Sequence, residues 1–220
     1  GHPRQFARIC QRPVRVEHAL GRPDRPGEVA CFRAFALRGH GFFNTDNPGR
    51  DLSPGGRNGK LMGNARAVLS DREAAPATTA LNSVLALDGE SGVDTESAIV
   101  PTTGDYTVEC WGFADPSARG DFRHLLDQDR QFYLGTNPEG KIRVGDSWSD
   151  TGLSYPYGGW HHFAVTKHSN GAELYIDGVV AAKHEGPLSP PKDATTFRIG
   201  QNRGGGERWL GFIDEVRVWN

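Results

Sequence analysis

The fold is decided by the runs Trp160-His-His-Phe-Ala-Val-Thr166, Ala172-Glu-Leu-Tyr-Ile176 and Val179-Val-Ala-Ala182. Apolar residues alternate with other residues in these runs, as they do in a half-buried β-strand. Asn170-Gly171 separates the first two runs, and Asp177-Gly178 separates the last two. Such dipeptides between alternating runs are the strongest short-range signal for a β-hairpin. The stretch therefore predicts two consecutive antiparallel hairpins.

Short alternating runs of the same kind continue on both sides of this stretch, and Asp88-Gly89 is another dipeptide typical of a tight turn. The expected strands are residues 83–87, 105–113, 122–126, 131–134, 141–144, 196–199 and 209–219, with residues 31–37 as a candidate first strand. No segment has helical periodicity, so a parallel α/β sheet is excluded. The pattern predicts an all-β, antiparallel two-sheet sandwich.

The bulk composition suits one β-domain with an additional arm. The chain has 220 residues, 29 of them Gly and 14 Pro, and a net charge of −2. That charge argues against nucleic acid as a partner, and no apolar run approaches the ~18 residues of a membrane helix. The chain starts at Gly1, so we expect a processed product or part of a larger polypeptide, from which a targeting segment could have been removed.

Residues 1–28 form an irregular, Pro-containing arm in this interpretation. Up to Arg38 the chain carries eight arginines against three acidic residues, a local excess of five positive charges. The arm is either a solvated linker or a segment that docks on an acidic partner. Cys10 and Cys31 either pair, which would indicate an oxidising compartment, or stay free, and Cys110 is expected to be a small buried hydrophobe.

Three stretches together resemble the laminin-G-like, concanavalin A-like lectin/glucanase superfamily. They are Tyr106-Thr-Val-Glu-Cys-Trp111, residues 160–166 with Leu174-Tyr-Ile-Asp-Gly178, and Ile199-Gly200 with residues 211–219. The loop at residues 51–63 is similar to the loop that opens these domains. The resemblance covers residues 29–220 and implies a jelly roll of two curved sheets whose first and last strands lie side by side.

This superfamily includes carbohydrate binders, adhesion modules, glycosidases and structural domains, and a fold does not determine a function. A retaining glycosidase needs two carboxyl groups about 5–5.5 Å apart. The family's Glu-x-Asp-x-x-Glu pattern is absent. Asp214 and Glu215 are adjacent and should face opposite ways, while Asp127 and Asp129 read as part of a turn. We therefore expect no enzyme, and we expect structural roles for the adjacent His161 and His162.

A carbohydrate site needs aromatic faces for sugar CH groups and polar groups for hydroxyls. The candidate platform lies in a loop-rich stretch, and polar side chains accompany it. The aromatic candidates are Trp148, Tyr155 and Tyr157, and the polar candidates are Asp146, Asp150 and Gln128. The alternative is that these aromatic side chains pack the core or its rim.

The resemblance also implies a possible structural calcium ion. In many relatives an Asp of the last strand meets carbonyl groups of the opening loop, and Asp214 matches that position, with Asp51 or Asp88 as its partner. Ca²⁺ takes six to eight oxygen ligands. The alternative is that Asp214 forms a salt bridge or caps a turn. No Cys/His pair has the spacing of a zinc site.

The leading expectation is a noncatalytic carbohydrate-binding or cell-adhesion module of an exported protein, located outside the cell, at its surface or in the periplasm. Its ligand would be a glycan. A rival function is a structural or assembly domain that binds a partner protein. A second rival is a glycoside hydrolase with an atypical site.

Overall fold

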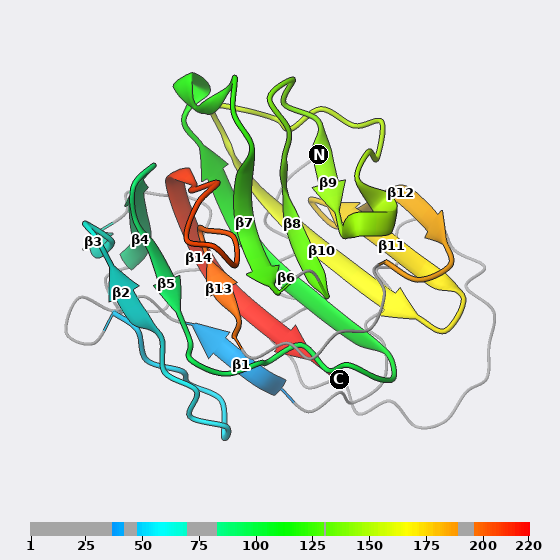
Figure 1. Ribbon diagram of the computed structural model, residues 1–220, viewed down its shortest axis with the longest axis horizontal. Helices are drawn as coiled ribbons and strands as arrows, with labels where there is room; N and C mark the ends of the chain where they lie inside the picture. Colours follow the sequence, from blue (N-terminus) through cyan, green and yellow to red (C-terminus); the bar gives the residue numbers. More distant parts are fainter. Residues whose placement is uncertain (1–36, 42–47, 70–82, 130, 189–195) are drawn as a thin grey trace.

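The computed structural model describes residues 37–41, 48–69, 83–129, 131–188 and 196–220, which form two antiparallel sheets (Figure 1). Two 3-10 helices, η2 (Pro116–Ala118) and η3 (Asp146–Trp148), lie in connections between strands. The predicted all-β jelly-roll sandwich is confirmed. No helix in these ranges has the length and apolarity that crossing a membrane requires.

The large sheet contains eight strands, seven of them in one path and β1 attached to β14. In order across the sheet, they are β12 (Val179–Glu185), β11 (Gly171–Ile176), β10 (Trp160–His168), β6 (Tyr106–Ala114), β14 (Leu210–Trp219), β4 (Ser83–Asp88) and β3 (Arg66–Leu69). β1 (Leu37–Gly41) pairs with the second half of β14, and β4 pairs with the first half. The expectation that the first and last strands lie side by side is thus confirmed.

The small sheet contains six strands. Across this sheet they are β2 (Lys60–Met62), β5 (Gly92–Asp94), β13 (Arg198–Ile199), β7 (Arg123–Gln128), β8 (Phe132–Thr136) and β9 (Ile142–Val144). The register of β7 against β8 shifts between His124 and Leu126. The shift buries both Leu125 and Leu126 in the core, while His124 and Asp127 lie together on the other face of β7.

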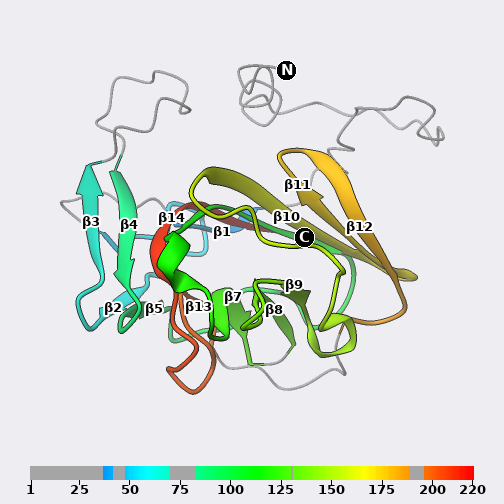
Figure 2. The ribbon, with the colours of Figure 1, turned by 90° about the horizontal axis from the view of Figure 1, so that it is seen from above.

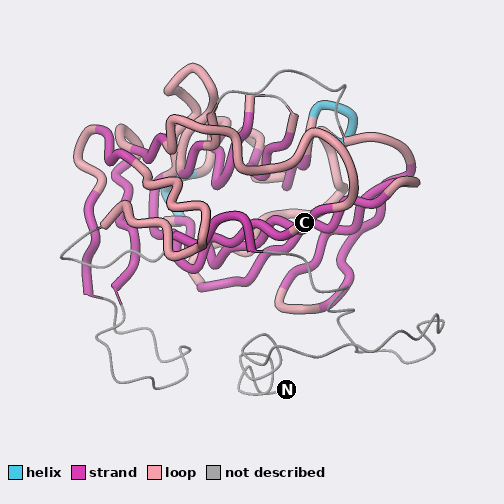
Figure 3. The backbone as a smooth tube through the Cα atoms, turned by 90° about the horizontal axis from the view of Figure 1, so that it is seen from below, coloured by secondary structure: helices cyan, strands magenta, loops and turns pink. Residues whose placement is uncertain are grey.

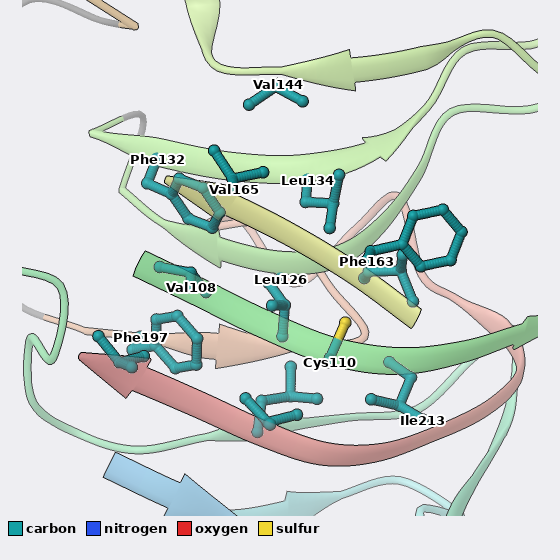
Figure 4. Packing of buried hydrophobic residues seen from close by; sticks show 14 of the residues in the cluster. Val108, Cys110, Leu126, Phe132, Leu134, Val144, Phe163, Val165, Phe197 and Ile213 are labelled. Carbon is teal, nitrogen blue, oxygen red and sulfur yellow. The ribbon is translucent and has the colours of Figure 1, made fainter. Parts of the chain in front are cut away.

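The core lies between the two layers, which Figures 2 and 3 show edge-on. Apolar side chains from both sheets meet there, as Figure 4 shows for Cys110 and Phe163 of the large sheet and Leu126 of the small sheet. The Cys110 side chain is fully buried, which confirms its expected role as a small hydrophobe. A Cβ atom added to Gly112 would lie 2.9 Å from Leu125, so the layers approach closely at this position.

The predicted strands are present with small shifts at their ends. Both predicted hairpins are present. The first reverses at Ser169-Asn170, because Gly171 already pairs with His168, and the second reverses at Asp177-Gly178, whose positive φ values suit a type I′ turn. The turn after Asp88 connects strands of different sheets. The candidate strand at residues 31–37, the arm boundary at residue 28, and Cys10 and Cys31 lie outside the described residues, except that Leu37 begins β1.

Candidate ligand-binding site

The three aromatic residues of the predicted platform are packed against other side chains. Trp148, in η3, is 6% exposed and stacks on His184 at 5.3 Å. Tyr155 is 3% exposed and stacks on Phe163 at 5.1 Å. Tyr157 is partly buried and meets Tyr155 edge-on at 5.1 Å. The structure therefore favours the alternative that these rings pack the core and its rim.

The polar residues of the predicted site do not gather around those rings. Gln128 is fully buried, accepting hydrogen bonds from the backbone nitrogens of Ile99 and Val100 at 2.7 and 2.8 Å and donating to the Val100 carbonyl at 2.6 Å. Gln128 thereby holds the segment around Ile99 and Val100 against the end of β7. Asp146 is exposed, and Asp150 accepts a hydrogen bond within its own loop. Ligand binding at these residues stays a prediction.

The three carboxylates of the predicted calcium site have separate surroundings. Asp51 accepts hydrogen bonds from the Ser53 amide and hydroxyl and from the Arg57 amide. Asp88 lies in an exposed turn and accepts from the Glu90 amide, and Asp214 is fully buried in β14. Within the described ranges, no group of three or more His, Cys, Asp or Glu side chains could hold a metal ion. The predicted calcium site also draws on backbone carbonyls of the opening loop, and it stays a prediction.

A polar cavity of about 360 Å³ lies at the rim of the sandwich. Its lining residues come from the turn after β4, the start of β7 and the loop between β13 and β14, and thus from segments of both sheets. Figure 1 shows where these strands lie. Its charged lining residues are Glu90, Asp121, Arg123, Glu207 and Arg208, and its glycines are Gly89, Gly205 and Gly206.

The guanidinium groups of the cavity are largely engaged by backbone carbonyls. Arg123 donates from Nε to the Ala118 carbonyl at 2.9 Å and from Nη1 to the Arg208 carbonyl at 2.5 Å. Arg208 donates from Nε to the Gly205 carbonyl at 2.6 Å. The arginines thus help to hold the cavity wall together.

The loop between β13 and β14 has a defined conformation. The Asn202 side-chain oxygen accepts hydrogen bonds from the Gly204 and Gly206 amides, each at 2.9 Å. Glu207 follows in the left-handed region with φ 47°, which is unfavourable for a residue with a side chain. Tertiary contacts must therefore hold Glu207 in place.

Those contacts come from His124 on β7. The His124 imidazole is buried, with Nδ1 3.2 Å from Asp127 Oδ2 and Nε2 2.8 Å from Glu207 Oε2. The His124 amide also donates to the Glu207 carbonyl at 2.8 Å. Burial lowers the pKa of His124, but the two carboxylates raise it more, so the net shift is upward.

A stack of planar groups covers this imidazole on the outer face of the small sheet. The Tyr133 ring stacks on His124 at 4.9 Å, and the Arg143 guanidinium lies 5.0 Å from the Tyr133 ring. Arg143 also lies 4.7 Å from the ring of Phe122, which is 39% exposed. The stack holds His124 away from solvent and orients it toward the cavity wall.

The remaining sequence candidates have structural partners. His161 contacts Asp177 at 2.7 Å and His162 contacts Glu109 at 3.4 Å, so the adjacent histidines reach different carboxylates. Asp129 pairs with Arg198 at 2.7 Å, whereas Asp127 contacts His124. The two histidines thus contact different partners, and so do the two aspartates, so neither pair acts together on one ligand in these contacts.

Sequence reasoning missed the cavity because its parts are far apart in the chain. Glu90 lies in the turn after β4, Arg123 begins β7 and Glu207 lies in the loop before β14, and the loop at residues 203–208 carries no motif of a known site. The strand alternation also does not reveal that His124 contacts Glu207, because the register shift in β7 changes which face His124 occupies. Only the loop's Gly and Asn content signalled a tight structure.

The family model described as the concanavalin A-like lectin/glucanases superfamily matches residues 87–220. A search of the curated proteins found no match. Among solved structures, the chain is similar to domain 4 of AbnA, a GH43 extracellular arabinanase from Geobacillus stearothermophilus in complex with arabinotriose. The TM-score is 0.61 with 21% identity, over 84% of this chain and 93% of that one.

Two other similar structures come from proteins with different roles. One is the binding domain of botulinum neurotoxin DC in complex with rat synaptotagmin II, with TM-score 0.58 and 12% identity over 84% of this chain and 48% of that one. The other is a Trypanosoma rangeli sialidase mutant with trans-sialidase activity, with TM-score 0.58 and 15% identity over 84% and 30%. Binding domains and enzymes thus share this fold.

Proposed function

Because this chain belongs to the concanavalin A-like lectin/glucanase superfamily, we propose that it is a noncatalytic carbohydrate-binding module of an exported protein. The polar cavity at the rim of the sandwich is the proposed binding site. The observation that carries this proposal is a cavity of about 360 Å³ with charged walls. This volume lies at the small end of the range for ligand pockets and suits one or two sugar rings.

The chemistry of the cavity is suited to sugar hydroxyl groups. Glu90 is exposed and Asp121 projects into solvent, so both carboxylates can accept hydrogen bonds from a ligand. Hydrogen bonds to charged groups are stronger than those between neutral groups. The backbone of Gly89, Gly205 and Gly206 lets a ligand approach closely because these residues have no side chain.

The charge of the cavity favours neutral or amino sugars over acidic sugars. Three carboxylates, of Glu90, Asp121 and Glu207, face two guanidinium groups, of Arg123 and Arg208. Both arginines already donate to backbone carbonyls. A uronic or sialic acid would therefore bring a further negative charge next to three carboxylates, and like-charge contacts oppose binding.

The similar arabinanase domain supports a binding role, because that structure contains arabinotriose and aligns with this chain over most of its length. Its parent is extracellular, which supports an exported location for this chain. The arrangement of carboxylates supports a noncatalytic role. Asp127 and Glu207 contact opposite nitrogens of one imidazole, instead of facing each other across the site of a scissile bond.

The proposal is tested by calorimetric titration with arabinotriose, glucosamine oligomers and galacturonate oligomers. We expect binding of a neutral or amino-sugar probe and none of the galacturonate probe. Glu90→Gln and Asp121→Asn should each weaken binding, while Glu185→Gln, an exposed change on β12, should leave it unaltered. Equal binding by wild type and both cavity variants would reject the cavity as the site.

A partner protein is the rival ligand, since the similar neurotoxin domain was solved with synaptotagmin. Stoichiometric co-purification with one protein, together with no binding of any probe or array glycan, would favour that role. Release of reducing sugar from a bound glycan would contradict the noncatalytic assignment.

A further inference from the structure

The cavity wall is tied to a buried imidazole that takes part in no other function described above. His124 lies 2.8 Å from Glu207 and 3.2 Å from Asp127, and each contact uses a different ring nitrogen. A neutral imidazole carries one N–H and can donate to only one of two carboxylates. The protonated ring carries a positive charge that attracts both carboxylates, so that form stabilises the whole cluster.

His124 contacts Glu207 through both its side chain and its backbone. The side chain is held by the imidazole and the backbone carbonyl by the His124 amide at 2.8 Å. Glu207 has a positive φ and follows Gly204, Gly205 and Gly206, a sequence with little local preference for one conformation. The position of this wall of the cavity therefore depends on the contact with β7 as well as on the hydrogen bonds of Asn202 within the loop.

We infer that His124 is a positioning residue whose protonated form fixes Glu207 and the loop at residues 202–208, so that ligand binding in the cavity weakens as the imidazole loses its proton. This inference rests on the proposed function. It adds that the module binds its glycan better in mildly acidic than in alkaline surroundings.

The groups that face His124 support this direction. Asp127 approaches from β7 and Glu207 from the loop, while Tyr133 of β8 stacks on the ring. Arg143 of β9 reaches the cluster through Tyr133, to whose hydroxyl it donates at 3.2 Å.

The cation on the neighbouring strand β13, Arg198, already forms ion pairs with other carboxylates. Arg198 contacts Asp94 at 3.3 Å and Asp129 at 2.7 Å. The two carboxylates in direct contact with the imidazole thus dominate its surroundings, in agreement with the raised pKa of His124.

The binding experiment measures arabinotriose affinity by titration calorimetry between about pH 5 and 8, the range in which histidines change charge. Wild type should lose at least about fivefold in affinity toward the alkaline end, in line with typical coupling energies between sites. His124→Gln should show weaker binding that varies little with pH. His168→Gln, which removes a histidine on β10, should keep the wild-type profile. A wild-type affinity that is constant over this range would overturn the inference.

A second measurement needs no glycan and separates this inference from the proposed function. NMR of the ring nitrogens should show His124 titrating above its ordinary range, and amide exchange at residues 202–208 should accelerate, beyond its intrinsic pH dependence, as the ring deprotonates. If His124→Gln does not fold, Glu207→Gln provides the same comparison from the partly exposed side. If these changes appear without binding of any probe, the coupling stands and the glycan proposal fails. A ring that is neutral throughout would overturn the coupling itself.

Discussion

At the scale of single residues, buried polar side chains in this protein mainly organise backbone. Gln128 illustrates this role, because its amide satisfies two amide donors and one carbonyl of the segment that leads to β6. Such a residue is indistinguishable from a ligand-binding Gln in the sequence. In the structure its amide is fully buried and bonded to backbone groups, which gives it a structural role, while its ligand role stays a prediction.

Gln128→Ala should lower the free energy of unfolding by about 3 kcal/mol, because it leaves the Ile99 and Val100 amides unsatisfied and buried. Urea unfolding measures this loss. Thr102→Ala, an exposed change in the same segment, should stay within about 0.5 kcal/mol of wild type. Loss of glycan affinity without loss of stability would instead support the predicted ligand role of Gln128.

Glu109 should make stability depend on pH in the acid range. Burial raises its pKa, but contacts with His162, Arg217 and Trp219 outweigh burial and bring the pKa to about 2. A lowered folded-state pKa stabilises the protein above the unfolded value of about 4.3, and this stabilisation is lost as the pH falls toward the folded value. Glu109→Gln should remove this loss, so the gap in melting temperature between wild type and variant should narrow steadily below about pH 4.5. A constant gap would contradict this assignment.

At the scale of elements, most strands and both hairpins could be predicted well, because they depend on local rules. Asp177-Gly178 forms the second turn as predicted, the first turn lies one residue before Asn170-Gly171, and alternation determined the buried face of β6. The site could not be predicted in the same way. Its cavity depends on Glu90, Arg123 and Glu207 from three separate segments, and on a register shift in β7 that no alternation rule anticipates.

Gly112→Ala tests the close approach of the two layers. The added methyl group would meet a Leu125 methyl at 2.9 Å and the Tyr155 hydroxyl at 3.1 Å. Overpacking of this kind costs about 1–3 kcal/mol, which equilibrium unfolding would measure. A variant as stable as wild type would indicate that the layers can separate locally at low cost.

The opening loop provides a test of the calcium prediction. Asp51→Ala should lower the melting temperature equally in EDTA and in calcium, because Asp51 acts through three hydrogen bonds to the loop. A drop seen only with calcium, together with a lower wild-type melting temperature in EDTA, would instead favour the structural ion predicted at Asp214. A ligand that binds only the native state stabilises it by mass action.

At the scale of the whole molecule, one strand connects all parts of the large sheet. β14 pairs with β6 on one side and with β4 and β1 on the other. Residues 210–219 are the last strand that a ribosome would synthesise among those described. A nascent chain that ends before Leu210 would therefore hold two separate half-sheets with open edges, a state prone to aggregation. Chaperones that shield such edges until synthesis passes β14 would be expected to increase the yield of this protein more than that of a domain built from sequential hairpins.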